Sequence, residues 1–244
     1  MNEFVTIYAL LYGNDLALHT RLLRSLFAYT PLDQAVIRLW CNTIGKPSQK
    51  LVMGFKEKHG SADFEYLFSE ENKPKYKAMR LMFHEMETWK PQTPWILWFD
   101  DDSYIDKSDW WQKTTGHIAR VPNCSYVGQS WYVHHLPGQW DFIKQATWFK
   151  GKPTEMCATR TPGIKSPGIT FAQGAYWWLR TDVMKQIDWP DVRLSHNGGD
   201  TLLGEAVRQQ GLPFTAFNYG VAVNKAKRRG LSEKPAGSKV NTRR

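Results

Sequence analysis

The chain has 244 residues, of which 42% are hydrophobic and 14% are aromatic, and its formal net charge at pH 7 is +9. This length and apolar content allow one large buried core, which argues against a disordered or fibrous protein. The three cysteines form no Cys-x-x-Cys pair, so the sequence indicates neither a disulfide framework nor a structural zinc site.

The first hundred residues alternate between apolar runs and amphipathic segments. Residues 5–12 predict a strand buried on both faces, and Asp15 is placed to cap a helix whose apolar residues recur at helical spacing. Further strands are predicted over 35–41, 64–68 and 94–99, and further helices over 48–58 and 75–88. This alternation predicts an α/β protein with a mostly parallel sheet covered by helices on both faces.

The second half of the chain has a different character. After a predicted strand over 125–133, residues 134–169 contain four Pro and four Gly and show no period, which indicates a functional lid or a partly disordered loop. Order returns in four later segments, predicted as a strand over 170–179, a helix opened by Thr181, a helix over 201–210 and a strand over 213–223.

The carboxyl end is strongly basic. Residues 225–244 hold eight Lys or Arg and one acidic residue, whereas the first 224 residues carry a net charge of only +2. Such a tail favours a polyanionic partner, either a nucleic acid or an anionic membrane surface, and a solvated, flexible end is the alternative. The first residues, MNEF, open no signal-like region, and no apolar run approaches the ~20 residues that span a bilayer. The sequence therefore predicts a cytoplasmic protein, in the host cytoplasm if it is viral.

Three aspartates, Asp100, Asp101 and Asp102, directly follow the predicted strand 94–99. Ligands of parallel sheets bind beyond the carboxyl ends of the strands. Adjacent carboxylates raise one another's pKa unless a cation neutralises them, and all-oxygen ligation favours Mg²⁺ or Mn²⁺ together with phosphate oxygens of a nucleotide. A solvated turn in which Asp102 or Ser103 caps a helix is the alternative.

The segment Trp95–Ile105 (WILWFDDDSYI) resembles the Asp-x-Asp motif of nucleotide-sugar glycosyltransferases with the GT-A fold, in the Asp-Asp-Asp-Ser-Tyr form of fringe-like enzymes. The resemblance implies a Rossmann-like GT-A domain with a mostly parallel central sheet flanked by helices. It also implies that Asp100 contacts the nucleotide ribose and that Asp102 binds the metal bridging the diphosphate. Asp100 would share in the metal site, and Asp101 would support both.

Two later segments match the same family in the right order. Phe171–Asp182 (FAQGAYWWLRTD) resembles its strand–helix segment on the acceptor side, where Gly174 would allow close approach to the donor sugar. Trp177 or Trp178 would stack on an acceptor ring, and a place in the core is the alternative for both.

The segment His196–Glu205 (HNGGDTLLGE) resembles the acidic motif that supplies the general base of inverting members. Asp200 would then take the proton of the acceptor hydroxyl, and a plain helix N-cap is the rival interpretation. No histidine follows His196, so the third metal ligand is His196, a water or nothing from the protein.

The start of the chain resembles the nucleotide-binding start of family 2 glycosyltransferases. Tyr12 would stack on the base, unless it is a core residue, and Lys77 and Arg80 would contact the donor, unless they lie on a solvated helix face. Asn42 stands where many relatives have an acidic uracil contact, which leaves the base of the donor open.

These observations predict one GT-A domain over 1–224, with a nucleotide-sugar-binding half over 1–105, an acceptor half over 106–224, and the basic tail 225–244. The expected activity is metal-dependent, inverting transfer of a sugar from a nucleotide-diphosphate sugar, with UDP-glucose as the first donor to test. A sugar nucleotidyltransferase shares the sheet and the metal aspartates, but no Gly-rich phosphate loop opens this chain.

The acceptor is inferred from charge and composition. A small GT-A enzyme with a basic tail, many Trp and basic residues in its long loop suits a polyanionic acceptor. Such an enzyme is similar to compact phage-type enzymes that glycosylate hydroxymethylated pyrimidines in DNA. The first acceptor to test is therefore 5-hydroxymethylcytosine in DNA. These loop residues are Lys144, Lys150, Lys152, Arg160 and Lys165. The alternatives are a saccharide or lipid-linked acceptor at an anionic membrane, and a non-catalytic nucleic-acid-binding module, which would not explain the three carboxylates.

Overall fold

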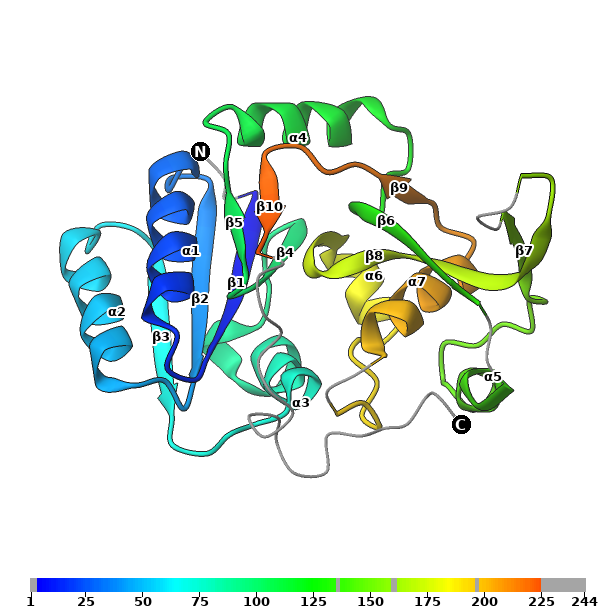
Figure 1. Cartoon of the computed structure of the whole chain (residues 1–244), viewed down its shortest axis with the longest axis horizontal. Helices are drawn as coiled ribbons and strands as arrows, with labels where there is room; N and C mark the ends of the chain where they lie inside the picture. Colours follow the sequence, from blue (N-terminus) through cyan, green and yellow to red (C-terminus); the bar gives the residue numbers. More distant parts are fainter. Residues whose placement is uncertain (1–3, 135–136, 159–161, 196–197, 225–244) are drawn as a thin grey trace.

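Figure 1 shows the computed structural model, which describes residues 4–134, 137–158, 162–195 and 198–224. Strands and helices alternate through the first half, as the sequence predicted. In chain order, the elements are β1 (Val5–Tyr12), α1 (Leu16–Tyr29), β2 (Ala35–Asn42), α2 (Lys46–Lys58), β3 (Phe64–Ser69), α3 (Lys75–Arg80), β4 (Trp95–Asp100), β5 (Ser103–Ile105), α4 (Trp110–Arg120), β6 (Tyr126–His134), α5 (Pro137–Lys144), β7 (Glu155–Ala158), β8 (Lys165–Arg180), α6 (Thr181–Gln186), α7 (Gly199–Gln209), β9 (Phe214–Ala216) and β10 (Val221–Val223).

The central sheet has eight strands. Seven follow the order β3-β2-β1-β4-β8-β6-β9, and β7 pairs with the outer part of β8. Strands β3, β2, β1 and β4 are parallel, whereas β8 runs antiparallel to β4, β6 and β7. The predicted α/β sheet with helices on both faces is therefore confirmed. The antiparallel strand β8 is a feature that the sequence did not predict.

Buried side chains form two cores, one on each face of the sheet. On β4, Leu97 and Phe99 belong to the core covered by α1, α2 and α4, whereas Trp98 belongs to the core covered by α3, α6 and α7. Successive side chains of a strand point to opposite faces, so a strand covered on both faces is apolar throughout. This explains the continuous apolar runs of β1 and β4.

Three predicted segments differ in the structure. The helix predicted over 75–88 is α-helical only as far as Arg80 and continues as a π-helical turn over Leu81–Glu85. The strand predicted over 213–223 is divided into β9 and β10, which pair with β6 and β5. The long loop 134–169 contains α5, β7 and the first residues of β8, so much of it is regular structure.

The carboxyl ends of β1 and β4 meet at one edge of the sheet, because the two strands are parallel neighbours. The last described residue also lies at this edge: the backbone amide of Asn224 donates to the carbonyl of Asp102 at 2.7 Å. The basic residues 225–244 lie outside the described residues. None of the described helices is long and apolar enough to cross a membrane.

Candidate active site

Asp100 ends β4 and is held by two donors. The Trp98 indole Nε1 donates to Asp100 Oδ1 at 2.8 Å, and the Lys75 ammonium donates to Asp100 Oδ2 at 2.8 Å. Burial raises the pKa of Asp100 above its ordinary value, although the Lys75 charge acts in the opposite direction. The first aspartate of the motif is thus a half-buried carboxylate with a fixed orientation.

Lys75 is a residue of the candidate site that the sequence analysis missed. Its ammonium lies 2.8 Å from Asp100 Oδ2, 2.9 Å from the carbonyl of Gly174 and 3.9 Å from Asp200 Oδ1. Burial alone would lower the pKa of Lys75, but the negative charges of Asp100 and Asp200 outweigh it, and the pKa lies above its ordinary value. Lys75 is therefore a permanent cation between the two carboxylates.

Replacing Lys75 by methionine is expected to destabilise the fold by about 2 kcal/mol at neutral pH, less than for a fully buried pair because the Asp100 side chain is 26% exposed. Without the ammonium, the already raised pKa of Asp100 rises further. The cost is therefore fully present only above the further raised folded-state pKa of Asp100 in the variant, and it disappears as the pH falls through the folded-state pKa that Asp100 has beside Lys75. Thermal melts at several pH values without added metal test this. An equal loss at neutral and acidic pH, or a loss no larger than that of Lys77→Met, would contradict it.

Asp200 is the second residue of α7 and faces Lys75 and Tyr76. The Tyr76 hydroxyl donates to Asp200 Oδ1 at 2.6 Å. Burial, and then the charge of Asp200, raises the pKa of Tyr76 well above its ordinary value, so Tyr76 stays a neutral donor. The N-cap of α7 is Gly198, and no side chain caps the helix, so the capping role considered for Asp200 is not what the structure shows.

Gly174 lies in a bulge of β8 directly against Asp200. Trp177 pairs with Gly128 and Ala172 pairs with Ser130, so residues 173–176 of β8 lie opposite one residue of β6. A Cβ added to Gly174 would stand 1.9 Å from Asp200 Oδ2. Bulges commonly redirect a strand beside an active site. Here the bulge brings the β8 backbone to both Lys75 and Asp200.

Replacing Gly174 by alanine is expected to lower kcat about a hundredfold, because the added methyl group must push the Asp200 carboxylate out of place. Steady-state kinetics on the variant test this. Gly116→Ala is the matched control, since a Cβ at Gly116 meets nothing within 4 Å. A wild-type kcat in Gly174→Ala would show that the position of the Asp200 carboxylate does not matter for catalysis.

Asp101 and Asp102 have different surroundings. Asp101 is buried, and its Oδ2 accepts from the backbone amide of Tyr12 at 2.8 Å and lies 3.4 Å from His19 Nε2. Asp101 therefore ties the end of β1 to the motif. Asp102 is half-buried, and its charge also acts on Lys75.

A divalent metal would have two carboxylates here, Asp100 and Asp102. The described residues contain no group of three His, Cys, Asp or Glu side chains that could hold a metal, and His196, the predicted third ligand, lies outside the described residues. Two carboxylates completed by phosphate oxygens are the donor set that Mg²⁺ takes in nucleotide sites. The residues present thus fit a metal that binds together with a diphosphate.

The polar residues next to Tyr12 form a closed network. Asn42 is buried, and its Nδ2 donates to Asn72 Oδ1 and to the Lys73 carbonyl, both at 2.8 Å, while its Oδ1 accepts from the Lys73 amide at 2.9 Å. Asn72 Nδ2 in turn donates to the half-buried Tyr12 hydroxyl at 3.2 Å. Asn42 therefore fixes the loop before α3, and its amide is fully used within the protein.

The contacts of Lys77 and Arg80 are with the segment before α7 and not with the aspartates of the motif or with Asp200. The Lys77 ammonium donates to the carbonyl of Val192, and Arg80 donates to the carbonyl of Pro190 at 2.8 Å and forms an ion pair with Asp188 at 3.2 Å. Both side chains tie α3 to the segment before α7.

Trp177 and Trp178 are core residues, the alternative that the sequence left open. Trp177 is 1% exposed and stacks on Trp98, with ring centroids 6.1 Å apart, and Trp178 is 0% exposed in the core of the opposite face. Neither ring presents a surface on which an acceptor could stack. Adjacent strand residues point to opposite faces, and here helices cover both.

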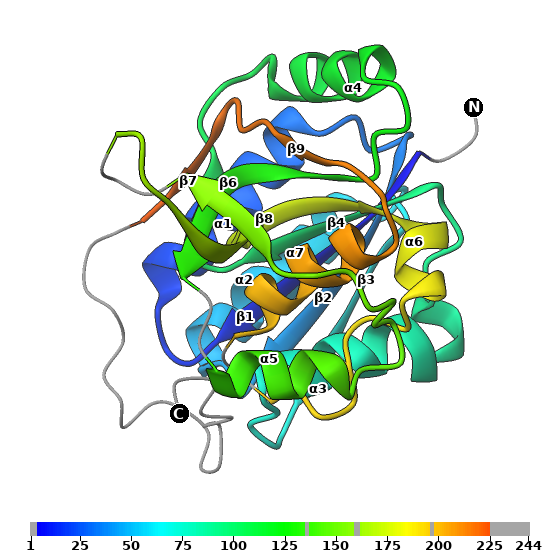
Figure 2. The same cartoon turned by 90° about the vertical axis from the view of Figure 1, so that its right-hand side faces the viewer.

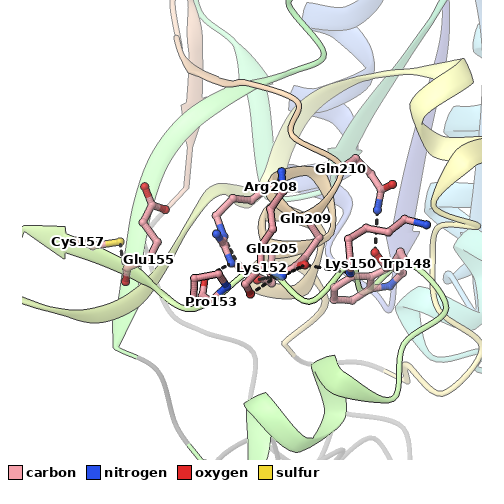
Figure 3. Close-up of polar contacts among 10 residues, drawn as sticks. All are labelled: Trp148, Lys150, Lys152, Pro153, Glu155, Cys157, Glu205, Arg208, Gln209 and Gln210. Carbon is pink, nitrogen blue, oxygen red and sulfur yellow. Dashed lines mark hydrogen bonds and ion pairs between the residues drawn. The ribbon is translucent and has the colours of Figure 1, made fainter.

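The segment 148–153 of the long loop is fixed to α7 (Figure 3). Buried Gln209 accepts from two backbone amides of this segment at 3.0 and 3.1 Å, and its Nε2 donates to Glu205 Oε1 at 2.7 Å. Arg208 pairs with Glu205 at 2.6 Å and donates to a carbonyl of the same segment at 2.8 Å. This part of the loop is therefore anchored to the helix that carries Asp200, rather than being a free lid; Figure 2 shows that helix beneath β8.

The basic residues of the loop have separate surroundings. The Lys144 ammonium lies 3.6 Å from Asp141, and the Lys152 ammonium donates to the carbonyl of Arg208 at 3.2 Å. Lys165 is exposed on β8, and Arg160 lies outside the described residues. Lys150 is exposed as well, so two of the four described cations of the loop have partners within the protein and the other two are exposed.

No protein-family model and no curated protein matches the chain. Solved structures do match. The mannosyltransferase PcManGT from Pyrobaculum calidifontis, solved with GDP-Man and Mn²⁺, matches 88% of this chain with a TM-score of 0.57 at 12% identity. GalNAc-T7, solved with UDP, GalNAc and Mn²⁺, matches 86% of it with a TM-score of 0.59 at 10% identity. The chain has the GT-A fold.

The GT-A chain spans 54% of the length of the mannosyltransferase and 41% of GalNAc-T7. A 4-diphosphocytidyl-2C-methyl-D-erythritol synthase from Anaerococcus prevotii matches too, over 92% of both chains, with a TM-score of 0.51 at 11% identity. At these identities the likeness concerns the fold alone. The reaction must therefore be argued from the side chains at the carboxyl edge of the GT-A sheet.

Proposed function

We propose that the chain is a metal-dependent, inverting glycosyltransferase that uses a nucleotide-diphosphate sugar. The observation that carries the proposal is the arrangement of Asp200, Lys75 and Asp100 around the Gly174 bulge. A carboxylate for proton transfer stands beside a cation and beside a carboxylate pair suited to a metal–diphosphate complex. Neighbours solved with Mn²⁺ and with GDP-Man or UDP support this assignment.

In the proposed reaction, the acceptor hydroxyl oxygen attacks the anomeric carbon and forms a new C–O bond. The bond from this carbon to the diphosphate oxygen breaks, and its electron pair leaves with the nucleotide diphosphate. Asp200 takes the hydroxyl proton, and Tyr76 holds the Asp200 carboxylate in place through its 2.6 Å hydrogen bond. Asp100 and Asp102 would hold a bound Mn²⁺ or Mg²⁺, which would supply positive charge to the diphosphate.

Lys75 adds a second, permanent cation at this point. Because its ammonium spans Asp100 and the carbonyl of Gly174, it lies between the motif and the bulge that approaches Asp200. We assign to it the donor contact that the sequence analysis gave to Lys77 and Arg80. The Asn42 amide is hydrogen-bonded within the protein, so it indicates no contact with the base of the donor. UDP-glucose is the first donor to test because of the family resemblance alone.

A nucleotidyltransferase is the second candidate, because a match named as the synthase of a diphosphocytidyl compound covers 92% of both chains. In this reaction, a phosphate oxygen of the substrate would attack the α-phosphorus of a nucleoside triphosphate, and the bond to the β-phosphate would break and release pyrophosphate. The connection between β1 and α1, Gly13-Asn14-Asp15, is not a glycine-rich phosphate loop. Nucleotidyl transfer also does not require a general base beside the bulge of β8. We therefore favour sugar transfer.

For the acceptor, we propose 5-hydroxymethylcytosine in DNA, with a saccharide or lipid-linked hydroxyl as the alternative. The basic residues 225–244, which follow directly on Asn224 beside Asp102, support a polyanionic acceptor. Mass spectrometry of duplexes incubated with UDP-sugars and Mn²⁺ tests this. A hexose mass added to the hydroxymethylated duplex and absent from the unmodified one is expected; donor turnover without such a product would assign the enzyme to another acceptor.

A further inference from the structure

Helices α1 and α2 together carry more net positive charge than residues 1–224 as a whole. The two helices contain six Lys or Arg and one acidic residue, Glu57. The basic residues are Arg21, Arg24, Lys46, Lys50, Lys56 and Lys58. Because residues 1–224 carry a net charge of only +2, the remainder of this part of the chain is net negative. The excess of positive charge in residues 1–224 therefore lies on these two helices.

The same helices expose large apolar side chains. Leu16 and Tyr29 on α1 are 42% and 39% exposed, and Met53 on α2 is 52% exposed. These are three of the seven large hydrophobic residues that are exposed in the described part of the chain. Apolar side chains among cations on a helical surface are typical of proteins that lie on a membrane interface.

Two open hollows flank Arg24. One, of about 810 Å³, lies along α1 and β5, and the other, of about 580 Å³, lies between α1 and α2. Arg24 and Ala28 line both hollows, and Arg21 stands over the Tyr104 ring with its guanidinium carbon 4.9 Å from the ring centroid. The cations thus stand beside recesses with apolar walls, where headgroup phosphates and the first carbons of a lipid would both find partners.

This surface is separate from the candidate active site. Helices α1 and α2 cover the face of the sheet opposite to α6 and α7 (Figure 1). Strand β5 packs against α1 and pairs with β10, so the strongly basic residues 225–244 follow a strand beside the same surface.

We propose that the outward face of α1 and α2 docks on an anionic membrane surface. Lipid headgroup phosphates would pair with Arg21, Arg24 and Lys50, and Leu16 and Met53 would enter the interfacial layer. Duplex DNA would use the cations but would gain nothing from exposed Leu16 and Met53, because its outer surface is phosphate. This docking leaves α7 and Asp200, on the opposite face of the sheet, clear of the membrane.

Flotation of the full chain with phosphatidylcholine vesicles, with and without phosphatidylglycerol, tests the proposal. We expect binding only to the anionic vesicles, and about a tenfold or larger loss of binding in Arg21→Glu/Arg24→Glu/Lys50→Glu. The matched control is Lys113→Glu/Arg120→Glu/Lys185→Glu, which reverses as many exposed cations on α4 and α6 and should bind almost as the wild type does. Circular dichroism and thermal melts verify that both variants fold.

A second variant separates a membrane from a polyanion in general. Leu16→Ser/Met53→Ser keeps every charge and is expected to bind anionic vesicles several-fold more weakly, with unchanged binding to duplex DNA. The proposal is overturned if the α1–α2 charge reversal binds vesicles no more weakly than its control. It is also overturned if the Ser variant binds vesicles as the wild type does, which would leave a surface for nucleic acid.

Discussion

Replacing Asp200 by asparagine is expected to lower kcat for sugar transfer about a thousandfold while leaving the donor KM near its wild-type value. Asparagine keeps the shape of the side chain, and its oxygen can still accept the hydrogen bond that Tyr76 donates at 2.6 Å. It cannot take a proton from the acceptor hydroxyl. The substitution therefore removes the base and leaves the metal carboxylates and the bulge in place.

Asp188→Asn is the matched control for this substitution. Asp188 is exposed, pairs with Arg80 on α3, and touches none of the aspartates at the carboxyl edge of the sheet. Its variant should keep wild-type kcat, measured as sugar transfer to the acceptor that the mass-spectrometric assay identifies. Full activity in Asp200→Asn would make Asp200 a structural partner of Tyr76 and Lys75 and would place the base elsewhere.

Replacing Asp102 by alanine is expected to abolish metal-dependent transfer, with a loss of about a thousandfold or more at any Mn²⁺ concentration. Asp102 is half-buried next to the Lys75–Asp100 pair, and its removal leaves one motif carboxylate for a metal. The fold should persist, because the hydrogen bond that the Asn224 amide donates to Asp102 is accepted by the backbone carbonyl, which the substitution keeps.

Asp106→Ala serves as the control for Asp102→Ala, since Asp106 is exposed a few residues further along the chain. A Mn²⁺ titration of activity, with thermal melts of both variants, distinguishes a lost metal ligand from a lost fold. If Asp102→Ala reaches wild-type rates at saturating Mn²⁺, the metal is bound elsewhere or is not needed for the chemistry.

Local pattern was sufficient for most of the fold. The predicted strand 5–12 coincides with β1, and the predicted strand 94–99 differs from β4 by one residue at each end. Both strands are buried on two faces, so their apolar runs are continuous and end at turn residues. The same reasoning placed the three aspartates at the carboxyl edge, where the parallel pairing of β1 and β4 brings Tyr12 to Asp101.

Long-range contacts account for what the sequence did not predict. Lys75 became a site residue because α3 meets Gly174, 99 positions later, and nothing in the local pattern separates it from Lys77 or Arg80 on the same helix. The bulge at residues 173–176 depends on how β6 pairs with β8. Likewise, the two Trp of β8 are core residues because elements from distant parts of the chain pack on each of them, and local pattern left this choice open.

The products of donor turnover test the central claim most directly. Purified protein is incubated with UDP-glucose and with other nucleotide-diphosphate sugars in Mn²⁺ or in chelator, and the products are separated by chromatography. Cleavage between the sugar and the diphosphate, which releases a nucleotide diphosphate only with metal and not in Asp102→Ala, is the result that sugar transfer predicts. Cleavage between the two phosphates, with release of a nucleotide monophosphate, or no turnover of any donor in the presence of metal, would contradict it.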